Sequence, residues 1–195
     1  MGDQISKITN GQIDRKMKES RCAVNSMGIT FPYSFASKWA KLNWYDISFA
    51  IDYRFLSHQS AVEHALTQLE QNDACAQVVL DLACLFENEI TSPYSIQPYI
   101  SKLESTVEEQ EKKLTQHKML YLLMKWVLDH QADYADPLRV VEIIYADFGH
   151  PQIIAGIVRY MPMTERDLGT VALNEARLFA NWGKYLDEQE RRFSR

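Results

Sequence analysis

Four polar side chains in the second half of the chain are of types that could hold a cation. Asp129, His130, Asp133 and Asp136 fall within eight residues, and carboxylate and imidazole groups are common metal ligands. Their spacing matches no HExxH or Cys/His motif. The alternative is a solvated helix end, where acidic groups oppose the helix dipole and favour a basic binding partner. We predict no resident metal or cofactor.

Motifs for nucleophilic catalysis and for phosphate binding are absent from the sequence. There is no GxSxG, GxGxxG or GxxxxGK pattern, and the chain has only 7 Gly. The three cysteines, Cys22, Cys75 and Cys84, form no CxxC pair. We expect Cys75 and Cys84 on apolar faces of one helix, as the buried, unreactive thiols of a reducing cytosol. We therefore do not expect an enzyme, although scattered residues can assemble an active site.

Helices are the elements that must position these residues. The 195 residues are 46% hydrophobic and 24% charged, and the low content of Gly and Pro argues against a β-rich design. No segment has the pattern of a signal peptide or a membrane span, so we expect a cytoplasmic protein. We predict an all-α fold of about seven to nine helices over residues 29–195. It would form a single-domain bundle or a short irregular stack of helical hairpins, after a poorly defined segment of residues 1–28.

The strongest folding signal is a helical hairpin at residues 136–162. Asp136, followed by a proline, is a favourable helix N-cap, and the helix that it begins is apolar on most of its circumference. Gly149 ends this helix, and a second helix should follow and stop before Pro162. Asp147 lies opposite the apolar stripe, so it either caps the helix after Gly149 or faces a partner.

Other apolar patterns predict the remaining helices. A helix N-capped by Asn43 is followed by a hairpin at residues 57–86. Residues 96–130 have a coiled-coil-like heptad pattern, with a break near Thr106 or Thr115 left open. The last helix should run from about residue 171 to 192. Its predicted apolar face consists of Leu173, Ala176, Phe179, Ala180, Gly183 and Leu186.

The net charge of −5 is unevenly distributed. Residues 1–42 carry +4, residues 43–136 carry −9, and residues 137–195 carry zero. An acidic middle disfavours nucleic acid and favours a basic protein partner, although it could also be a set of solvated helix faces. The candidate partner-binding residues are Glu108, Glu109, Glu111, Asp129, Asp133 and Asp136, with Asp147 and His150 at the hairpin corner.

Several motifs resemble a known family. They are D-P-L-x-x-V-E-x-I-Y-A-D-F-x-x-P from Asp136, R-Y-M-P from Arg159 and R-L-x-x-N-W-x-x-Y-L from Arg177. The segment from Leu42 is also similar, with Ala50 where a Gly is usual. The chain thereby resembles the bacterial domain of unknown function 2247 family. The resemblance implies a cytoplasmic bacterial protein with no established activity. Proteins of this sort often sit beside secreted toxins as candidate immunity proteins.

These observations favour an immunity-type protein that neutralises a partner, such as a toxin domain, by occluding it. Two alternatives stay open. One is a small-ligand binder or enzyme whose pocket is lined by Trp39, Trp44, Tyr145 and Tyr160. The other is a scaffold or assembly module that uses the charged helix arm at residues 106–117.

Overall fold

The computed structural model of the chain describes residues 25–71, 76–162 and 166–193. These residues form nine α-helices and three 3₁₀ turns without a strand, which confirms the predicted all-α fold. None of the described helices is both long enough and apolar enough to cross a membrane. The elements, in chain order, are α2 (Tyr33–Trp39), α3 (Trp44–Asp52), α4 (Gln59–Gln71), α5 (Gln77–Ala83), η1 (Glu87–Glu89), α6 (Pro93–Glu104), α7 (Glu109–Lys112), α8 (Thr115–Asp129), η2 (Gln131–Asp133), α9 (Pro137–Asp147), η3 (Gln152–Ile157) and α10 (Val171–Phe193).

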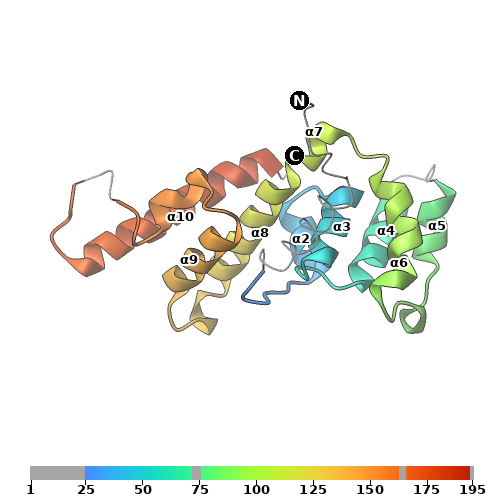
Figure 1. Cartoon of the computed structure of the whole chain (residues 1–195), viewed down its shortest axis with the longest axis horizontal. Helices are drawn as coiled ribbons and strands as arrows, with labels where there is room; N and C mark the ends of the chain where they lie inside the picture. The colour runs from blue at the N-terminus through green and yellow to red at the C-terminus, as the bar shows by residue number, and fades with distance from the viewer. Residues whose placement is uncertain (1–24, 72–75, 163–165, 194–195) are drawn as a thin grey trace, which may run out of the picture.

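The helices are arranged along one long axis (Figure 1). Helix α8 runs through the middle of the molecule and packs on α3, α9 and α10. Helices α4, α5 and α6 form one end, which α3 joins to the centre by packing on α4 and α6. Helix α9, η3 and the first half of α10 form the other end. The two ends therefore carry separate surfaces.

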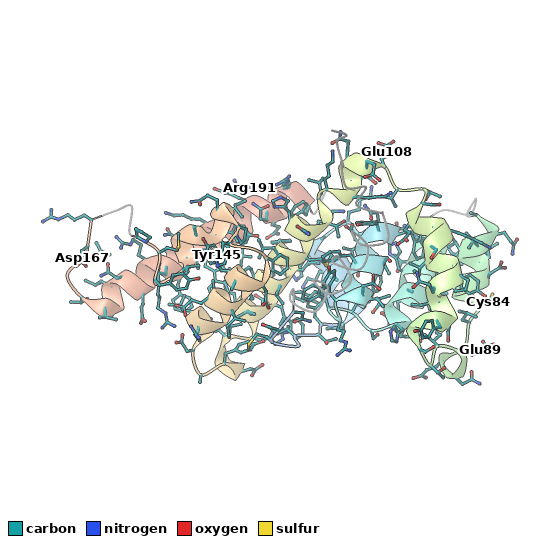
Figure 2. All side chains as sticks on the ribbon, viewed as in Figure 1. Cys84, Glu89, Glu108, Tyr145, Asp167 and Arg191 are labelled. Carbon is teal, nitrogen blue, oxygen red and sulfur yellow. The ribbon has the colours of Figure 1, made fainter. Side chains whose placement is uncertain are left out.

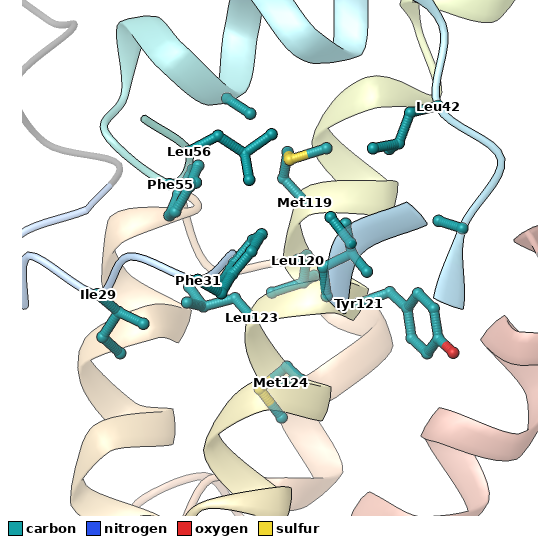
Figure 3. Close-up of a cluster of buried hydrophobic side chains, with 14 of the residues drawn as sticks. Ile29, Phe31, Leu42, Phe55, Leu56, Met119, Leu120, Tyr121, Leu123 and Met124 are labelled. Atoms are coloured by element: carbon teal, nitrogen blue, oxygen red, sulfur yellow. The ribbon is translucent and has the colours of Figure 1, made fainter. Parts of the chain in front are cut away.

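The core is centred on α8. The six residues from Met119 to Met124 are all buried, as expected for a helix segment that is apolar around its circumference. Figure 3 shows Ile29, Phe31 and Phe55 in the same cluster as the α8 side chains. The rings of Phe31 and Phe55 stack with 6.2 Å between their centroids. The chain before α2 and after α3 thus covers one side of α8.

Two predicted helix starts are confirmed by their capping hydrogen bonds. Asn43 Oδ1 accepts from Asp46 N, and Asp46 Oδ2 accepts from Asn43 N, both at 2.9 Å. This reciprocal pair is a capping box at the start of α3. Asp136 Oδ1 accepts from Arg139 N at 3.0 Å and begins α9.

The second helix predicted for the 136–162 hairpin is wrong. Its place is taken by the six-residue 3₁₀ turn η3. Gly149 and His150 both adopt left-handed backbone angles, with φ of 73° and 64°, and redirect the chain after α9. Residues three apart eclipse in a 3₁₀ helix, so Ile154 and Ile157 share one side, where both are buried. Two turns suffice to bury them, and the chain becomes extended at Val158.

The heptad region of residues 96–130 is not one helix, because the chain breaks near both positions that the sequence left open. Helix α6 ends at Glu104, α7 spans four residues, and α8 begins at Thr115. At the first break, Ser105 Oγ donates to Lys102 O at 2.6 Å and Thr106 Oγ1 donates to Leu103 O at 2.7 Å. Side chains that bond nearby carbonyls in this way compete with helix continuation.

The predicted apolar face of the last helix is buried only in its second half. Leu173, Ala176 and Ala180 are exposed, whereas Trp182, Tyr185 and Leu186 are buried. The reason is length. At about 1.5 Å per residue, the 23 residues of α10 extend about 34 Å and the 15 residues of α8 about 22 Å. The first half of α10 therefore extends beyond the helix that covers the second half.

The expected burial of Cys84 is also wrong, because its side chain is exposed. Helix α5 ends at Ala83, so Cys84 lies at the helix terminus and not on the apolar face. Cys22 and Cys75 fall outside the described residues. The described part of the predicted 57–86 hairpin is confirmed, since α4 and α5 pack against each other.

Candidate functional site

The acidic residues predicted to bind a partner do not form one surface. Glu108, Glu109 and Glu111 are exposed around α7, before the start of α8. Asp129 and Asp133 are exposed at its far end. The length of α8, about 22 Å, separates the two groups. Basic neighbours offset part of the negative charge of each group. Lys112 Nζ lies 2.8 Å from Glu109 Oε1, and Lys125 Nζ lies 2.6 Å from Asp129 Oδ1.

At the corner after α9, Asp147 has a structural contact. Its Oδ2 accepts hydrogen bonds from Ser26 N and Ser26 Oγ, both at 2.8 Å. The helix-capping interpretation of Asp147 is therefore wrong, because the carboxylate holds the start of the described chain against α9. Asn25 attaches the same segment to the end of α3, by donating from Nδ2 to Tyr53 O at 3.1 Å. Residues 1–24 of the predicted N-terminal segment lie outside the described residues.

The exposed side chain of His150 packs on the core edge. Its ring meets the Tyr145 ring edge to face, with 4.9 Å between centroids. The left-handed backbone turn fixes the position of His150 at the corner after α9. His150 is therefore not part of the group of candidate glutamates around α7. Among the described residues, His150 belongs to no group of three or more His, Cys, Asp or Glu side chains that could hold a metal ion.

Asp136 belongs to an ion-pair network centred on Arg159. Arg159 Nη2 lies 2.7 Å from Asp136 Oδ2, and its Nε lies 2.9 Å from Glu142 Oε1. A longer contact of 3.7 Å joins Arg159 Nη1 to Glu175 Oε1 on α10. Glu142 is also paired with Arg139, at 2.9 Å. The network connects the start of α9, the segment after η3 and the first half of α10.

The charges of this network are mutually stabilised. The hydrogen bond from Arg159 is the main reason that the pKa of Asp136 lies below its ordinary value. Burial raises the pKa of Glu142, but the hydrogen bonds from Arg159 and Arg139 outweigh burial and leave this pKa lowered. Each guanidinium nitrogen of Arg159 faces a carboxylate. The network therefore holds these segments together, and Arg159 offers no unpaired positive charge to an anionic ligand.

A groove of about 540 Å³ lies between η3 and the first half of α10. This volume is within the range of ligand-binding clefts. Asn181 Nδ2 donates to Gly156 O at 3.1 Å and joins the two walls. The lining residues that matter below are Val158, Arg159, Met161, Pro162, Val171 and Leu178.

The aromatic pocket that the sequence suggested is not formed. Trp44 and Tyr145 are buried in the core, while Tyr160 is 57% exposed. None of these three, and not Trp39, lines the groove. Their rings pack with neighbours: Trp44 contacts His64, and the Trp39 ring lies 4.2 Å from Lys125 Nζ. Aromatic composition alone could not distinguish core residues from pocket residues.

The Asp129–Asp136 segment does not assemble a metal site within the part of the chain that the structure describes. Asp129 pairs with Lys125, and Asp136 pairs with Arg159. The His130 ring stacks on Trp126 at 3.8 Å between centroids, and its Nδ1 lies 2.9 Å from Trp126 O. Each of these groups is already engaged by a different neighbour.

The largest imbalance of charge lies at the end formed by α4, α5, η1 and α6. We call residues 57–104 the acidic lobe. The sequence of the lobe contains seven Asp/Glu and one Lys, Lys102. Its exposed acids in the described residues are Glu70, Asp81, Glu87 and Glu89. Within the described residues these four side chains form no salt bridge.

Two exposed aromatic side chains accompany these acids around η1. Phe86 is 73% exposed and Tyr94 is 85% exposed. Glu89 Oε2 accepts from Phe86 N at 2.8 Å and stabilises the turn that presents the Phe86 ring. We call residues 86–94 the η1 tip; Figure 2 places its labelled residue Glu89 at the opposite end of the molecule from Asp167. Sequence reasoning missed this tip, although a charge count over residues 57–104 alone could have indicated it.

Comparisons with known proteins identify a family but no function. A family model described as "Uncharacterized protein conserved in bacteria (DUF2247)" matches residues 33–190. This match spans the helices from α2 into α10 and includes both the acidic lobe and the groove. No curated protein and no solved structure matches the chain. Because the family model covers most of the sequence, the chain belongs to the bacterial DUF2247 family.

Proposed function

We propose that this protein binds a basic protein partner in the bacterial cytoplasm and neutralises it by occlusion, as an immunity protein does with a toxin. The observation that supports this proposal is the acidic lobe, whose sequence contains seven acidic residues and one lysine. The chain itself performs no reaction in this proposal, and its role is to cover a functional surface of the partner. The partner surface should be rich in Lys and Arg.

The η1 tip has the composition of a protein-binding surface. Aromatic residues such as Phe86 and Tyr94 supply large contact areas at the centre of interfaces. The surrounding carboxylates of Glu87 and Glu89 would attract a basic partner and orient it before contact. The pair of exposed rings gives the tip an apolar contact in addition to the long-range attraction.

The acids around α7 form a weaker candidate surface. Glu109 is paired with Lys112, and Lys113 lies beside them in the sequence. Three acids therefore face two lysines in this segment, which leaves little net field. For this reason we place the partner at the η1 tip and use α7 as the control.

The test measures the affinity of the purified protein for the toxin domain encoded beside it, by isothermal titration calorimetry at low and high salt. The double variant Glu87→Lys/Glu89→Lys should weaken binding by about tenfold or more, or about 1.4 kcal/mol. Glu108→Lys/Glu111→Lys changes the net charge equally at exposed positions of the α7 region, and it should bind nearly as tightly as the wild type. A further pair of variants, Tyr94→Ala and Tyr160→Ala, compares how much an exposed tyrosine at each end of the molecule contributes to the affinity.

Co-expression gives the matching functional readout. The wild type should restore growth of cells that express the toxin domain, and the η1 variants should not. Equal loss of affinity in both charge-reversal variants would assign the effect to total charge and would contradict the η1 tip. No binding by the wild type at low salt would contradict the proposed function as a whole.

A further inference from the structure

The groove beside α10 is lined by apolar side chains on both walls. Val158, Met161 and Pro162 line it from the segment after η3, and Val158 is only 2% exposed. Val171 and Leu178 line it from α10. Seven residues make about two turns of an α-helix, so these two side chains lie on the same side of α10. An apolar ligand would therefore contact both walls.

A carboxylate is set into the α10 wall of this groove. Glu175 also lines the groove, four residues after Val171 and three before Leu178, so it lies between them on the same side of the helix. Its Oε1 is 3.7 Å from Arg159 Nη1, which is beyond hydrogen-bond distance. Its Oε2 has no hydrogen bond or ion pair to a described residue. Glu175 therefore keeps its acceptor capacity for a ligand.

Arg159 does not neutralise Glu175, because closer carboxylates hold its guanidinium group. Asp136 lies 2.7 Å from Arg159 Nη2, and Glu142 lies 2.9 Å from Arg159 Nε. Arg139, the other guanidinium of this network, pairs with Glu142. Two guanidinium groups thus face three carboxylates, which gives the network a net charge of −1. Glu175 has the longest contact of the three acids, so the surplus negative charge lies on the groove wall.

Arg177, the second arginine that lines the groove, is directed to the turn before α10. Its Nη1 donates to Arg166 O at 2.8 Å, and its Nη2 donates to Asn174 Oδ1 at 3.1 Å. The pKa of Asp167 is lowered by hydrogen bonds from Asn174 and Gly169 N, and the charge of Arg177 lowers it further. An anionic ligand would have to compete with these contacts for Arg177.

We propose that the groove binds a small molecule in which an apolar ring system carries a protonated amine. The amine donates to Glu175, and the rings lie against Met161 and Leu178. A protonated amine has three donors and a positive charge, so it satisfies the carboxylate that the arginines leave unpaired. The groove volume of about 540 Å³ accommodates such a molecule. The hydrogen bond from Asn181 to Gly156 O holds the two walls together, so the site is formed before the ligand enters.

Isothermal titration calorimetry near neutral pH with three indole ligands tests this selectivity. Tryptamine carries the amine, tryptophol replaces it with a hydroxyl, and indolepropionate replaces it with a carboxylate. Tryptamine should bind with a Kd on the order of 1 mM or below, as expected for a ligand of its size. Tryptophol should bind about tenfold more weakly, and indolepropionate more weakly still, because neither pairs with a carboxylate. Equal affinities for tryptamine and tryptophol would overturn the proposal, as would no binding of tryptamine.

Variants of α10 separate the charge of the site from its apolar contact. Glu175→Gln keeps the shape of the side chain and should weaken tryptamine binding about tenfold, with little effect on tryptophol. Glu188→Gln changes an exposed acid on the same helix outside the groove and should keep the wild-type preference. Leu178→Ala should weaken the binding of both ligands, because it removes part of the apolar wall. Circular dichroism melts confirm that each variant is folded. A preference for tryptamine that survives Glu175→Gln would contradict the role of this carboxylate.

Side-chain amide signals show where the amine binds, because the acidic lobe also attracts cations. In proton–nitrogen correlation spectra, tryptamine should shift the Asn181 amide in the groove and leave the Gln97 amide on α6 unchanged. The opposite result would place the amine on the acidic lobe and overturn the proposal. The groove lies apart from the η1 tip, so Glu175→Gln should bind the toxin domain as tightly as the wild type. Amine binding and toxin binding can therefore fail independently.

Discussion

A buried charge pair ties α3 to α8. Asp46 is fully buried, and its two carboxylate oxygens accept hydrogen bonds from Thr115 Oγ1, Lys118 Nζ and Asn43 N. Lys118 also donates to Lys41 O at 3.0 Å. The carboxylate is a capping-box residue that also neutralises a lysine 72 positions away.

Removal of the lysine should destabilise the fold strongly. Lys118→Met would leave Asp46 buried without a counter-charge, at a cost of about 3–5 kcal/mol in the free energy of unfolding. Lys125→Met removes a lysine from the more exposed pair with Asp129 and should cost about 1 kcal/mol or less. Urea unfolding followed by circular dichroism measures both. Similar losses in the free energy of unfolding for Lys118→Met and Lys125→Met would contradict the greater burial of the Asp46–Lys118 pair.

A buried histidine should make stability depend on pH. His64 is 3% exposed, its Nδ1 lies 2.9 Å from Tyr33 Oη, and its Nε2 has no partner in the described residues. Burial lowers the pKa of His64 to about 4 from 6.5. The unfolded chain therefore binds the proton more readily, so stability falls as the pH drops below 6.5 and this loss is complete near pH 4.

The predicted loss from His64 is about 2 kcal/mol between about pH 7 and pH 5. His64→Gln cannot titrate and should reduce the difference between the unfolding free energies at these two pH values. His117→Gln, at an exposed position, should leave the difference as it is in the wild type. An unchanged pH dependence in His64→Gln would show that the histidine is not buried in its neutral form.

The start of α9 combines a cap and an ion pair in one side chain. Asp136 accepts from Arg139 N through Oδ1 and from Arg159 through Oδ2. Asp136→Asn keeps the capping oxygen and loses the negative charge, whereas Asp136→Ala loses both. Asn caps about as well as Asp, and loss of the cap costs about 1 kcal/mol.

The melting temperature should therefore be highest for the wild type, intermediate for Asp136→Asn and lowest for Asp136→Ala. The pKa of Asp136 is lowered in the folded state, so its contribution is present above the unfolded pKa and disappears as the pH falls into the acid range. Asp133→Ala changes an exposed residue just before the helix, and it should have little effect. Equal melting temperatures for the two Asp136 variants would show that the cap contributes nothing.

The elements also differ in how completely they are covered. Helix α8 is enclosed by its neighbours, while the first half of α10 lies alongside η3 and leaves Leu173 exposed. The same 3.6-residue periodicity thus corresponds to a core contact near Trp182 and to an open surface near Leu173. Only the position of neighbouring helices distinguishes the two halves of α10.

For the whole molecule, the charge asymmetry should reduce stability at low salt. The acids of the lobe repel one another with a single lysine among them. Glu87→Lys, which leaves the hydrogen bond from Phe86 N to Glu89 in place, should therefore be slightly more stable than the wild type at low ionic strength, by about 0.5 kcal/mol. Added salt should remove the difference, because it screens exposed charges. A destabilised variant, measured by thermal melting, would contradict the repulsion.

Local features were predictable because their causes lie within a few residues. Asp136 with Pro137 starts a helix by pairing or removing orphan N–H groups, and Asn43 with Asp46 closes a capping box. The helical class, most helix positions and the excess of acidic charge therefore followed from the sequence.

Long-range features depended on the tertiary structure, because they join residues far apart in the chain. The pairing of Asp46 with Lys118 and of Asp136 with Arg159 connects separate helices, and no local pattern contains it. Exposure followed the same rule: Phe86 and Leu173 are apolar, yet both side chains are more than half exposed. Amino-acid type specifies how strongly a side chain favours burial. The relative lengths and packing of the helices decide which side chains are buried.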